Sequence, residues 1–239
     1  MMAEEGFLRH ALLSSVGVEH GFGTRNATEP EGIVRPRQVH GALVAIVKSV
    51  VPPEPFEADA LATRNPGTGV GVITADCVPV LAVTAGGASV AAIHAGWRGL
   101  AEGVVEAGIV ALEQLGGRKE EVRAVIGPCI GACCYEVDEP VLMALRRRFG
   151  DALDHVLSPS RPGHARLDLG QLVGTALRRS GLGDDQWGRL DGACTRCDPK
   201  RFYSYRRDGP RAGRLVHYIV ARDFESKLRV SKKRAAQQG

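Results

Sequence analysis

Short apolar runs, separated by segments rich in glycine and proline, are the main pattern along this chain. Several of these runs contain many β-branched residues and predict strands. They are Leu43–Val51, Val70–Thr74, Pro79–Thr84, Ala88–His94, Val122–Ile126 and Leu215–Val220. Some are apolar at consecutive rather than alternate positions, which is typical of strands without a solvent-facing side. We therefore expect sheets that are covered on both faces.

Other segments repeat apolar residues at the spacing of an α-helix, which predicts helices with one core-facing side. They are Leu100–Leu115, Val137–Phe149 and Leu169–Leu182. Gly116–Gly117 would end the first helix, and Asp168 is the expected N-cap of the third. Because strands and helices alternate without a strict βαβ rhythm, the sequence predicts an α/β (α+β) fold of mixed β-sheets packed with helices.

The length of 239 residues allows one large domain or two small ones. Apolar residues at 44% and charged residues at 24% exclude a disordered, collagen-like or coiled-coil chain. Pro52–Pro55 resembles a linker, but so short a stretch is more typical of a surface loop. We expect one domain over residues 1–225, followed by a basic, flexible tail over residues 226–239.

The charge balance gives little support to a nucleic-acid partner. Lys and Arg total 31 against 27 Asp and Glu, a net charge of +4, and the basic stretch Lys227–Arg234 accounts for the excess. Proteins that bind nucleic acids concentrate basic residues on one face. No stretch approaches the roughly 18 consecutive apolar residues of a membrane span, and no secretory signal is visible. We expect a cytoplasmic protein, with reduced cysteines and no membrane partner.

Histidine and cysteine stand at the ends of predicted strands. His94 ends one strand, Cys77 lies between two, and His40 precedes an apolar run. One cysteine and two histidines can bind zinc and leave a fourth position for water or substrate. Their spacing matches no compact metal motif, so from the residues alone we favour two hydrogen-bonded histidines and a small buried thiol over a metal site.

The same residues fit a second chemistry. Cys77 could be a nucleophile activated by the His94 imidazole, with Asp76 or His40 orienting that base. Their positions in the sequence do not separate a nucleophilic thiol from a metal ligand. A metal assay does.

The remaining cysteines include a lone CxxC, Cys194–Cys197. A structural zinc usually needs a second pair, which Cys133–Cys134, or Cys129, would supply. Because adjacent cysteines fit a shared tetrahedral site poorly, we favour buried thiols at these positions.

Two arginine-containing segments are candidate anion sites. Arg206 and Arg207 follow two tyrosines, and such a group can bind phosphate or stack on a flat ring. Arg25 and Asn26 form a second segment that could contact phosphate. The alternative for both segments is a solvated loop whose arginines pair with carboxylates.

Several motifs occur together, in one order, within about residues 20–220. They are RQVHG at 37–41, TADCVPVL at 74–81, AAIHAGWRGL at 91–100, IGPCIGACCYEV at 126–137, LDL at 167–169 and CTRCDPKRFYSYRRDG at 194–209. This combination resembles the YfiH-like family, long called multicopper polyphenol oxidase or laccase-domain proteins and more recently purine nucleoside phosphorylases. The resemblance implies a single-domain YfiH-like sandwich of mixed sheets and helices.

The resemblance also implies a site and an activity. In that family the histidine of QVHG, the cysteine of ADC and the histidine of HAGWRG bind zinc, which carries over to His40, Cys77 and His94. The implied reaction is phosphorolysis of adenosine, inosine and S-methyl-5′-thioadenosine, a pentosyl transfer to phosphate, with deamination of adenosine as a second activity. Purine nucleosides and phosphate are then the partners of a monomer or homodimer.

Individual roles follow from this chemistry. Arg25 and Arg207 are the candidate phosphate ligands, with Asn26 beside Arg25, and Asp76 would orient a ligand or relay a proton. The chain departs from the family pattern between Arg25 and Arg37, where relatives carry a longer segment.

Two other functions use the same residues. A copper-dependent polyphenol oxidase is the older family assignment, but seven histidines in scattered contexts leave few imidazoles for a multicopper cluster. A cysteine hydrolase that cleaves an amide in peptidoglycan precursors would use Cys77 as nucleophile and His94 as base. Metal content distinguishes the copper oxidase from a zinc enzyme. Activity that survives a chelator distinguishes the cysteine hydrolase from a zinc enzyme.

Overall fold

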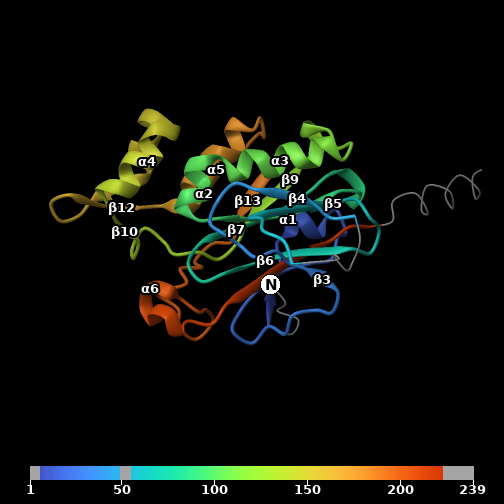
Figure 1. Cartoon of the computed structure of the whole chain (residues 1–239), viewed down its shortest axis with the longest axis horizontal. Coiled ribbons are helices and arrows are strands. Elements are labelled where there is room, and N and C mark those ends of the chain that lie inside the picture. Colours follow the sequence, from blue (N-terminus) through green and yellow to red (C-terminus); the bar gives the residue numbers. More distant parts are fainter. Residues whose placement is uncertain (1–5, 49–54, 223–239) are drawn as a thin grey trace, which may run out of the picture.

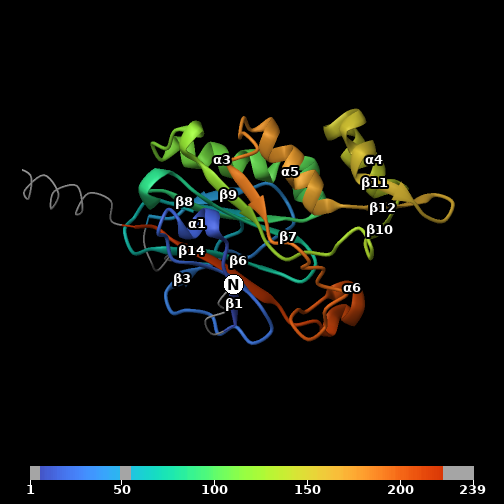
Figure 2. The ribbon, with the colours of Figure 1, turned by 180° about the vertical axis from the view of Figure 1, so that it is seen from behind.

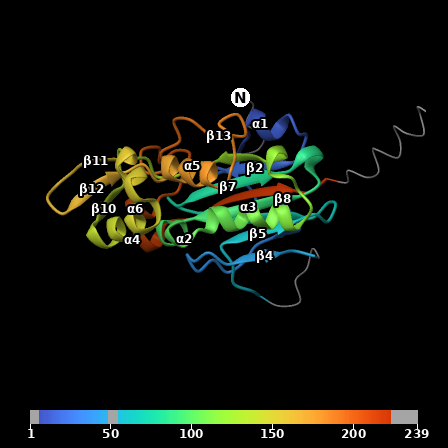
Figure 3. The ribbon, with the colours of Figure 1, turned by 90° about the horizontal axis from the view of Figure 1, so that it is seen from above.

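The computed structural model describes residues 6–48 and 55–222, which form three stacked layers (Figure 1). Helices α2 (Trp97–Glu102), α3 (Val104–Gln114) and α5 (Leu169–Arg179) cover one face of a six-stranded sheet. Figure 3 shows these helices lying across that sheet. A five-stranded sheet packs on its other face. The predicted α/β class with mixed sheets and helices is therefore confirmed.

The six-stranded sheet is mixed: its two outermost pairs are parallel and the inner pairs are antiparallel. Its order is β13 (Trp187–Arg189), β9 (Arg123–Ile126), β7 (Val78–Val83), β8 (Val90–Ala95), β5 (Ala60–Thr63) and β4 (Val44–Ile46). The central strand β7 is buried along its whole length. Its Val80 and Ala82 pack toward the helices, whereas Leu81 and Val83 pack toward the second sheet. This alternation explains why the run is apolar at every position.

The five-stranded sheet combines segments from both ends of the described chain. Its order is β1 (Phe7–Leu8), β2 (His20–Gly23), β14 (Leu215–Val220), β6 (Gly69–Thr74) and β3 (Ile33–Val34). A small sheet of β10 (Glu136–Asp138), β12 (His164–Leu167) and β11 (Leu157–Pro159) lies with α4 (Glu139–Phe149) at one end of the molecule (Figure 2).

The remaining helices in the described part of the chain are short. Two are the α-helices α1 (Ala11–Ser14) and α6 (Tyr205–Asp208). The others are 3₁₀ helices at Ala85–Gly87, Lys119–Glu121, Gly150–Val156 and Gly209–Arg211. None of the described helices has the length and apolar character needed to cross a membrane.

The predicted helices exist, but two of their boundaries differ. The first is broken by Gly103, whose φ of 94° ends α2 and begins α3, so a single helix over Leu100–Leu115 is wrong. The second begins at Glu139, because the residues before it form β10. Asp168 caps α5 as expected, accepting a 2.8 Å hydrogen bond from the Gln171 backbone N–H.

The predicted strands agree with the structure at the sheet centres. Leu215–Val220 matches β14, and four other runs match β6, β7, β8 and β9 within two residues. Leu43–Val51 shortens to β4. Most of Pro52–Pro55 and the whole tail at 226–239 lie outside the described residues, so the predictions made for them stay predictions.

Strand register brings distant segments to one edge of the six-stranded sheet. His94, near the end of β8, pairs with Pro79 at the start of β7. Ala60, at the start of β5, pairs with Ile93, and Ile126, at the end of β9, pairs with Val80. The chain segments that adjoin these strand ends therefore meet at the same edge.

His217 predicts a pH dependence of stability. It is fully buried in β14, and its Nδ1 has no hydrogen-bond partner among the described residues. Burial, reinforced by the charge of His94, lowers the pKa of His217 from 6.5 to about 3. The neutral ring gains a proton only on unfolding, so its contribution is intact above pH ~6.5 and is lost as pH falls toward 3. We expect the free energy of unfolding to fall by about 2 kcal/mol from pH 7 to pH 5 through this group.

Urea unfolding at both pH values, on the wild type and on His217→Gln, measures this contribution. The variant should lose less stability on acidification, because glutamine does not titrate. Equal losses in the two proteins would assign the acid sensitivity to other groups.

Candidate metal centre

Three segments bring His40, Cys77 and His94 together at the sheet edge. His40 precedes β4, Cys77 immediately precedes β7, and His94 lies in β8. One ligand atom from each lies within 4.8 Å of the other two. The two imidazole rings stand edge to face, with centroids 4.8 Å apart. The candidate ligands chosen from the sequence are therefore neighbours in space.

Asp59, fully buried just before β5, organises this group. Its Oδ1 lies 2.8 Å from His94 Nδ1 and accepts a 2.9 Å bond from the His40 backbone N–H. Its Oδ2 accepts a 2.8 Å bond from the Gly41 N–H. One carboxylate therefore orients one imidazole and holds the loop that carries the other, which is the arrangement of an outer-shell carboxylate at a metal site.

Two further residues fix the approach of the segments. The Gln38 side chain makes a pair of bonds to the backbone of Ile73 in β6, at 2.7 and 2.8 Å. Gly96 follows β8, and a Cβ there would lie 3.2 Å from His40 Cδ2 and 3.3 Å from Cys77 Sγ. A side chain at Gly96 would push both candidate ligands by a few tenths of an ångström, so glycine lets them approach undisturbed.

The electrostatics favour an ionised thiol. Burial opposes ionisation of Cys77, but hydrogen bonds to His40 and His94 outweigh it and lower its pKa to about 6. Burial also opposes protonation of His94, yet Asp59 and Cys77 raise its pKa to about 9. Burial would raise the pKa of Asp59, but hydrogen bonds from His94, Gly41 and His40 bring it below the usual range. The site thus holds a thiolate, the form that binds metals and also the form that acts as a nucleophile.

The donor set fits zinc. Zn–S and Zn–N bonds of about 2.3 and 2.0–2.1 Å require ligand atoms less than about 4 Å apart around one ion. Ligand atoms within 4.8 Å of one another meet this requirement after small adjustments. Three protein ligands leave a fourth coordination position open, as in catalytic zinc sites.

Asp76 anchors a loop instead of pointing at the ligands. Its Oδ1 accepts a 2.5 Å bond from Thr195 Oγ1, and its Oδ2 accepts bonds from Ser204 Oγ and the Arg206 N–H, at 3.0 and 2.6 Å. The residue is 8% exposed and has a φ of 95°, a conformation rare for a side chain other than glycine. Because Asp76 directly precedes Cys77, these bonds tie the segment between β13 and β14 to the loop that carries Cys77.

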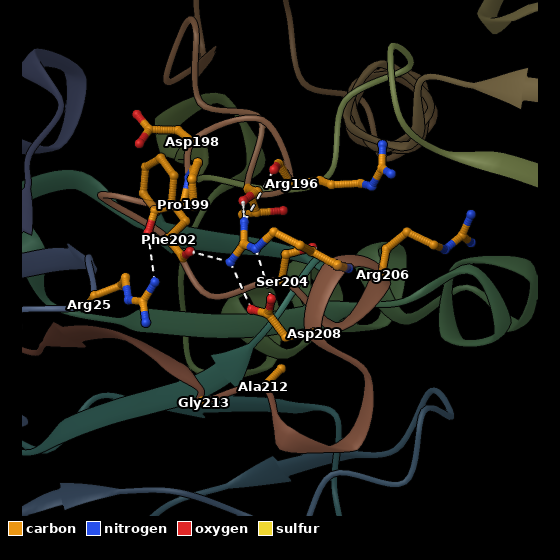
Figure 4. Close-up of polar contacts among 12 residues, drawn as sticks. Arg25, Arg196, Asp198, Pro199, Phe202, Ser204, Arg206, Asp208, Ala212 and Gly213 are labelled. Atoms are coloured by element: carbon orange, nitrogen blue, oxygen red, sulfur yellow. Dashed lines mark hydrogen bonds and ion pairs between the residues drawn. The ribbon is translucent and has the colours of Figure 1, made fainter.

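Arg25 and Asn26, the two residues near the N-terminus that were predicted to bind phosphate, have different surroundings in the structure. Arg25 Nη1 donates to the Pro199 carbonyl at 2.6 Å (Figure 4). Its guanidinium lies 4.6 Å from the Tyr203 ring centroid. Its Nε and Nη2 make no hydrogen bond among the described residues. Asn26 instead lines a cavity of about 1030 Å³, together with the acidic residues Glu19, Glu29 and Glu31 and with Arg9. Those carboxylates would repel phosphate.

The Arg207 guanidinium is held by contacts within its own loop. Its guanidinium donates to the carbonyls of Thr195 and Phe202, at 3.0 and 2.9 Å, and pairs with Asp208 at 2.8 Å. These contacts favour a role in positioning the loop over one as a phosphate ligand.

The sequence analysis did not single out three residues that lie near the candidate metal centre. Asp59 belongs to no recognisable motif. Tyr135 is half-buried, and both burial and the negative charge of Cys77 raise its pKa, so its hydroxyl stays protonated. Arg98 is exposed, stacks 4.4 Å from the Trp97 ring centroid and has no ion pair in the described structure. The only signal for Tyr135 and Arg98 was their place inside the quoted motifs.

Comparison with known proteins assigns the class first. The model of the multi-copper polyphenol oxidoreductase laccase family matches residues 22–222. With its mixed-sheet sandwich and His₂Cys group, the protein is therefore of the laccase-domain class. The crystal structure of the hypothetical protein YfiH from Bacillus licheniformis superposes with a TM-score of 0.78, at 26% identity, over 86% of this chain and 93% of that one. The chain belongs to the YfiH-like family.

Two relatives carry names that describe activities. A purine nucleoside phosphorylase from Xylella fastidiosa strain 9a5c is 38% identical over 185 residues, which cover 75% of this chain and 68% of that protein. An adenosine deaminase, RL5, from an unknown prokaryotic organism is 32% identical over 202 residues, which cover 77% of this chain and 73% of that protein.

Proposed function

We propose that this chain is a zinc-dependent purine nucleoside phosphorylase that acts on adenosine, inosine and S-methyl-5′-thioadenosine and also deaminates adenosine. The observation that carries the proposal is the His40–Cys77–His94 group with its buried Asp59. The names of the two relatives support the substrate class.

The two reactions make different demands on the site. In phosphorolysis, a phosphate oxygen bonds to C1′ of the ribose while the C1′–N9 bond breaks, and the departing purine takes up a proton. In deamination, water adds at C6 of adenine and ammonia leaves. Zinc held by His40, Cys77 and His94 would supply Lewis acidity to polarise a substrate oxygen or water.

The chain's own residues supply binding and proton positions. The protonated Tyr135 hydroxyl makes no hydrogen bond among the described residues, so it is free to donate one to a departing purine. Arg25 keeps free N–H donors for phosphate, and Arg206 and Arg98 are the cations near Tyr135. Asp59 holds His94 in one orientation and keeps its Nδ1 away from the substrate.

A cysteine hydrolase is the second candidate. A Cys77 thiol with a pKa of about 6 beside a His94 imidazole with a pKa of about 9 forms a thiolate–imidazolium pair, as a nucleophilic cysteine requires. Such an enzyme would cleave an amide, for example in a peptidoglycan precursor, and would keep its rate in EDTA.

One assay tests the proposal. The purified chain is incubated with adenosine, inosine or S-methyl-5′-thioadenosine, with and without phosphate, and its metal content is measured on the same sample. We expect free base only with phosphate, ammonia from adenosine without it, and loss of both products after treatment with a chelator. Absence of free base and of ammonia from every substrate would contradict the proposal. Bound copper with a blue colour would favour the oxidase instead.

A further inference from the structure

Four cysteines gather outside the candidate metal centre. Cys133 and Cys134 lie in the segment after β9, and Cys194 and Cys197 in the segment after β13. All four sulfur atoms lie within 4.8 Å of one another. Cys129 is not in this group; it is buried, and burial raises the pKa of its thiol to about 12.

The sequence-based expectation of buried thiols is wrong for Cys133 and Cys197, which are exposed, although Cys134 is buried. Burial as small apolar side chains therefore does not account for the grouping. Nor are the sulfurs paired as disulfides, which have an S–S bond of about 2.05 Å. Cys133 Sγ lies 3.6 Å from both Cys194 Sγ and Cys197 Sγ, and Cys134 Sγ lies 3.3 Å from Cys197 Sγ.

These separations match a tetrahedron of thiolates around one ion. Zn–S bonds of about 2.3 Å place the sulfurs of a tetrahedral site about 3.8 Å apart. A multi-iron cluster occupies more space and holds its sulfurs farther apart, so the cysteine group has room for one ion. Tetrahedral sulfur coordination is typical of structural zinc.

A local turn makes the two adjacent cysteines compatible with one site. The backbone N–H groups of Cys134 and Tyr135 both donate to the Gly131 carbonyl, at 2.9 and 3.0 Å. In this turn both neighbouring side chains reach Cys197. The objection raised by their adjacency in the sequence therefore does not hold.

The surroundings suit a negatively charged centre. One Zn²⁺ with four thiolates carries a net charge of −2. The Gly131 N–H donates to Cys194 Sγ at 3.3 Å, and Arg196 Nη1 lies 3.5 Å from Cys134 Sγ. Arg166 Nη1 donates to the Cys133 carbonyl at 2.7 Å, which places a second cation beside the group. Such N–H and arginine contacts orient and stabilise metal-bound thiolates.

We propose that Cys133, Cys134, Cys194 and Cys197 bind a second zinc ion, with a structural role. The ion would join two segments that flank the candidate metal centre. One carries Tyr135, whose ring lies 5.1 Å from the Arg206 guanidinium, and the other carries Thr195, which bonds to Asp76. The ion would therefore fix both segments without contacting substrate. This proposal is independent of the proposed function.

Zinc counting in four proteins tests the proposal. Full-length protein is purified with a non-thiol reductant, and zinc per chain is measured by mass spectrometry. We expect two equivalents in the wild type and in the control Cys129→Ala. We expect one in Cys77→Ala and one in the double variant Cys133→Ser/Cys197→Ser.

X-ray absorption at the zinc edge of Cys77→Ala decides the question even if the double variant does not fold. The expected shell is sulfur only, at about 2.3 Å. Nitrogen or oxygen ligands, bound iron, or no zinc in Cys77→Ala would overturn the proposal. If instead the wild type holds one equivalent that survives in Cys77→Ala with a sulfur-only shell, the cysteine site stands and the assignment of His40, Cys77 and His94 fails.

Discussion

Replacing Cys77 by alanine is expected to remove one zinc ion per chain and almost all turnover. Cys77 is the only candidate ligand that brings negative charge to the His40–Cys77–His94 group, and it lies where the start of β7 meets the end of β8. Several kcal/mol of transition-state stabilisation from a metal corresponds to a rate loss of about 10³-fold. Zinc content and kcat/KM for inosine with phosphate, measured on one preparation, check both effects.

Arg25→Ala is the matched contrast to that variant. Arg25 contacts the Pro199 carbonyl and the Tyr203 ring and touches none of the three candidate ligands, so its loss should leave the zinc count unchanged. Removal of one charge-assisted hydrogen bond to phosphate should raise the KM for phosphate about tenfold. Full zinc and full rate in Cys77→Ala would show that the site is wrongly assigned.

Replacing Asp59 by asparagine is expected to weaken metal binding about 10- to 100-fold, the usual cost of losing an outer-shell carboxylate. Both carboxylate oxygens of Asp59 accept hydrogen bonds, from the His40 and Gly41 N–H groups and the His94 ring. The asparagine amide offers only one acceptor oxygen in their place. A buried donor left unpaired should also lower the free energy of unfolding by about 2–3 kcal/mol. Chelator competition and urea unfolding measure the two effects separately.

Asp185→Asn, at an exposed position, is the control for this change of charge. It should alter stability by no more than about 0.5 kcal/mol and leave metal affinity unchanged. If Asp59→Asn binds zinc as tightly as the wild type, the carboxylate does not position the ligands, and its role is confined to holding the loop.

The central strands could be predicted from the sequence because burial on both faces leaves no polar position in them. β7 is the example, and β14 departs from this pattern only at His217 and Tyr218. The small sheet could not be predicted, because strands such as Leu157–Pro159 are short and partly exposed and have no regular alternation. The break at Gly103 was also missed, since the apolar stripe continues on both sides of it.

The candidate ligands were visible because chemistry-bearing residues stood at the ends of predicted strands. Asp59 was not visible, because a lone acid before a buried strand has no motif, and its importance lies in contacts to His94 and Gly41 that only the register creates. The same limit applied to Arg207: its residue type suggested an anion site, whereas its carbonyl contacts appear only in three dimensions.

The position of β14 between β2 and β6 has a consequence for biosynthesis. The five-stranded sheet cannot be completed until residues 215–220 have left the ribosome, because they pair with strands at 20–23 and 69–74. Pairing across such separations in sequence is slow and exposes unpaired strand edges while it is pending. Until β14 is synthesised, the edges of β2 and β6 that pair with it therefore stay unpaired. The nascent chain is most prone to aggregation during this interval, and protection by chaperones would matter most then.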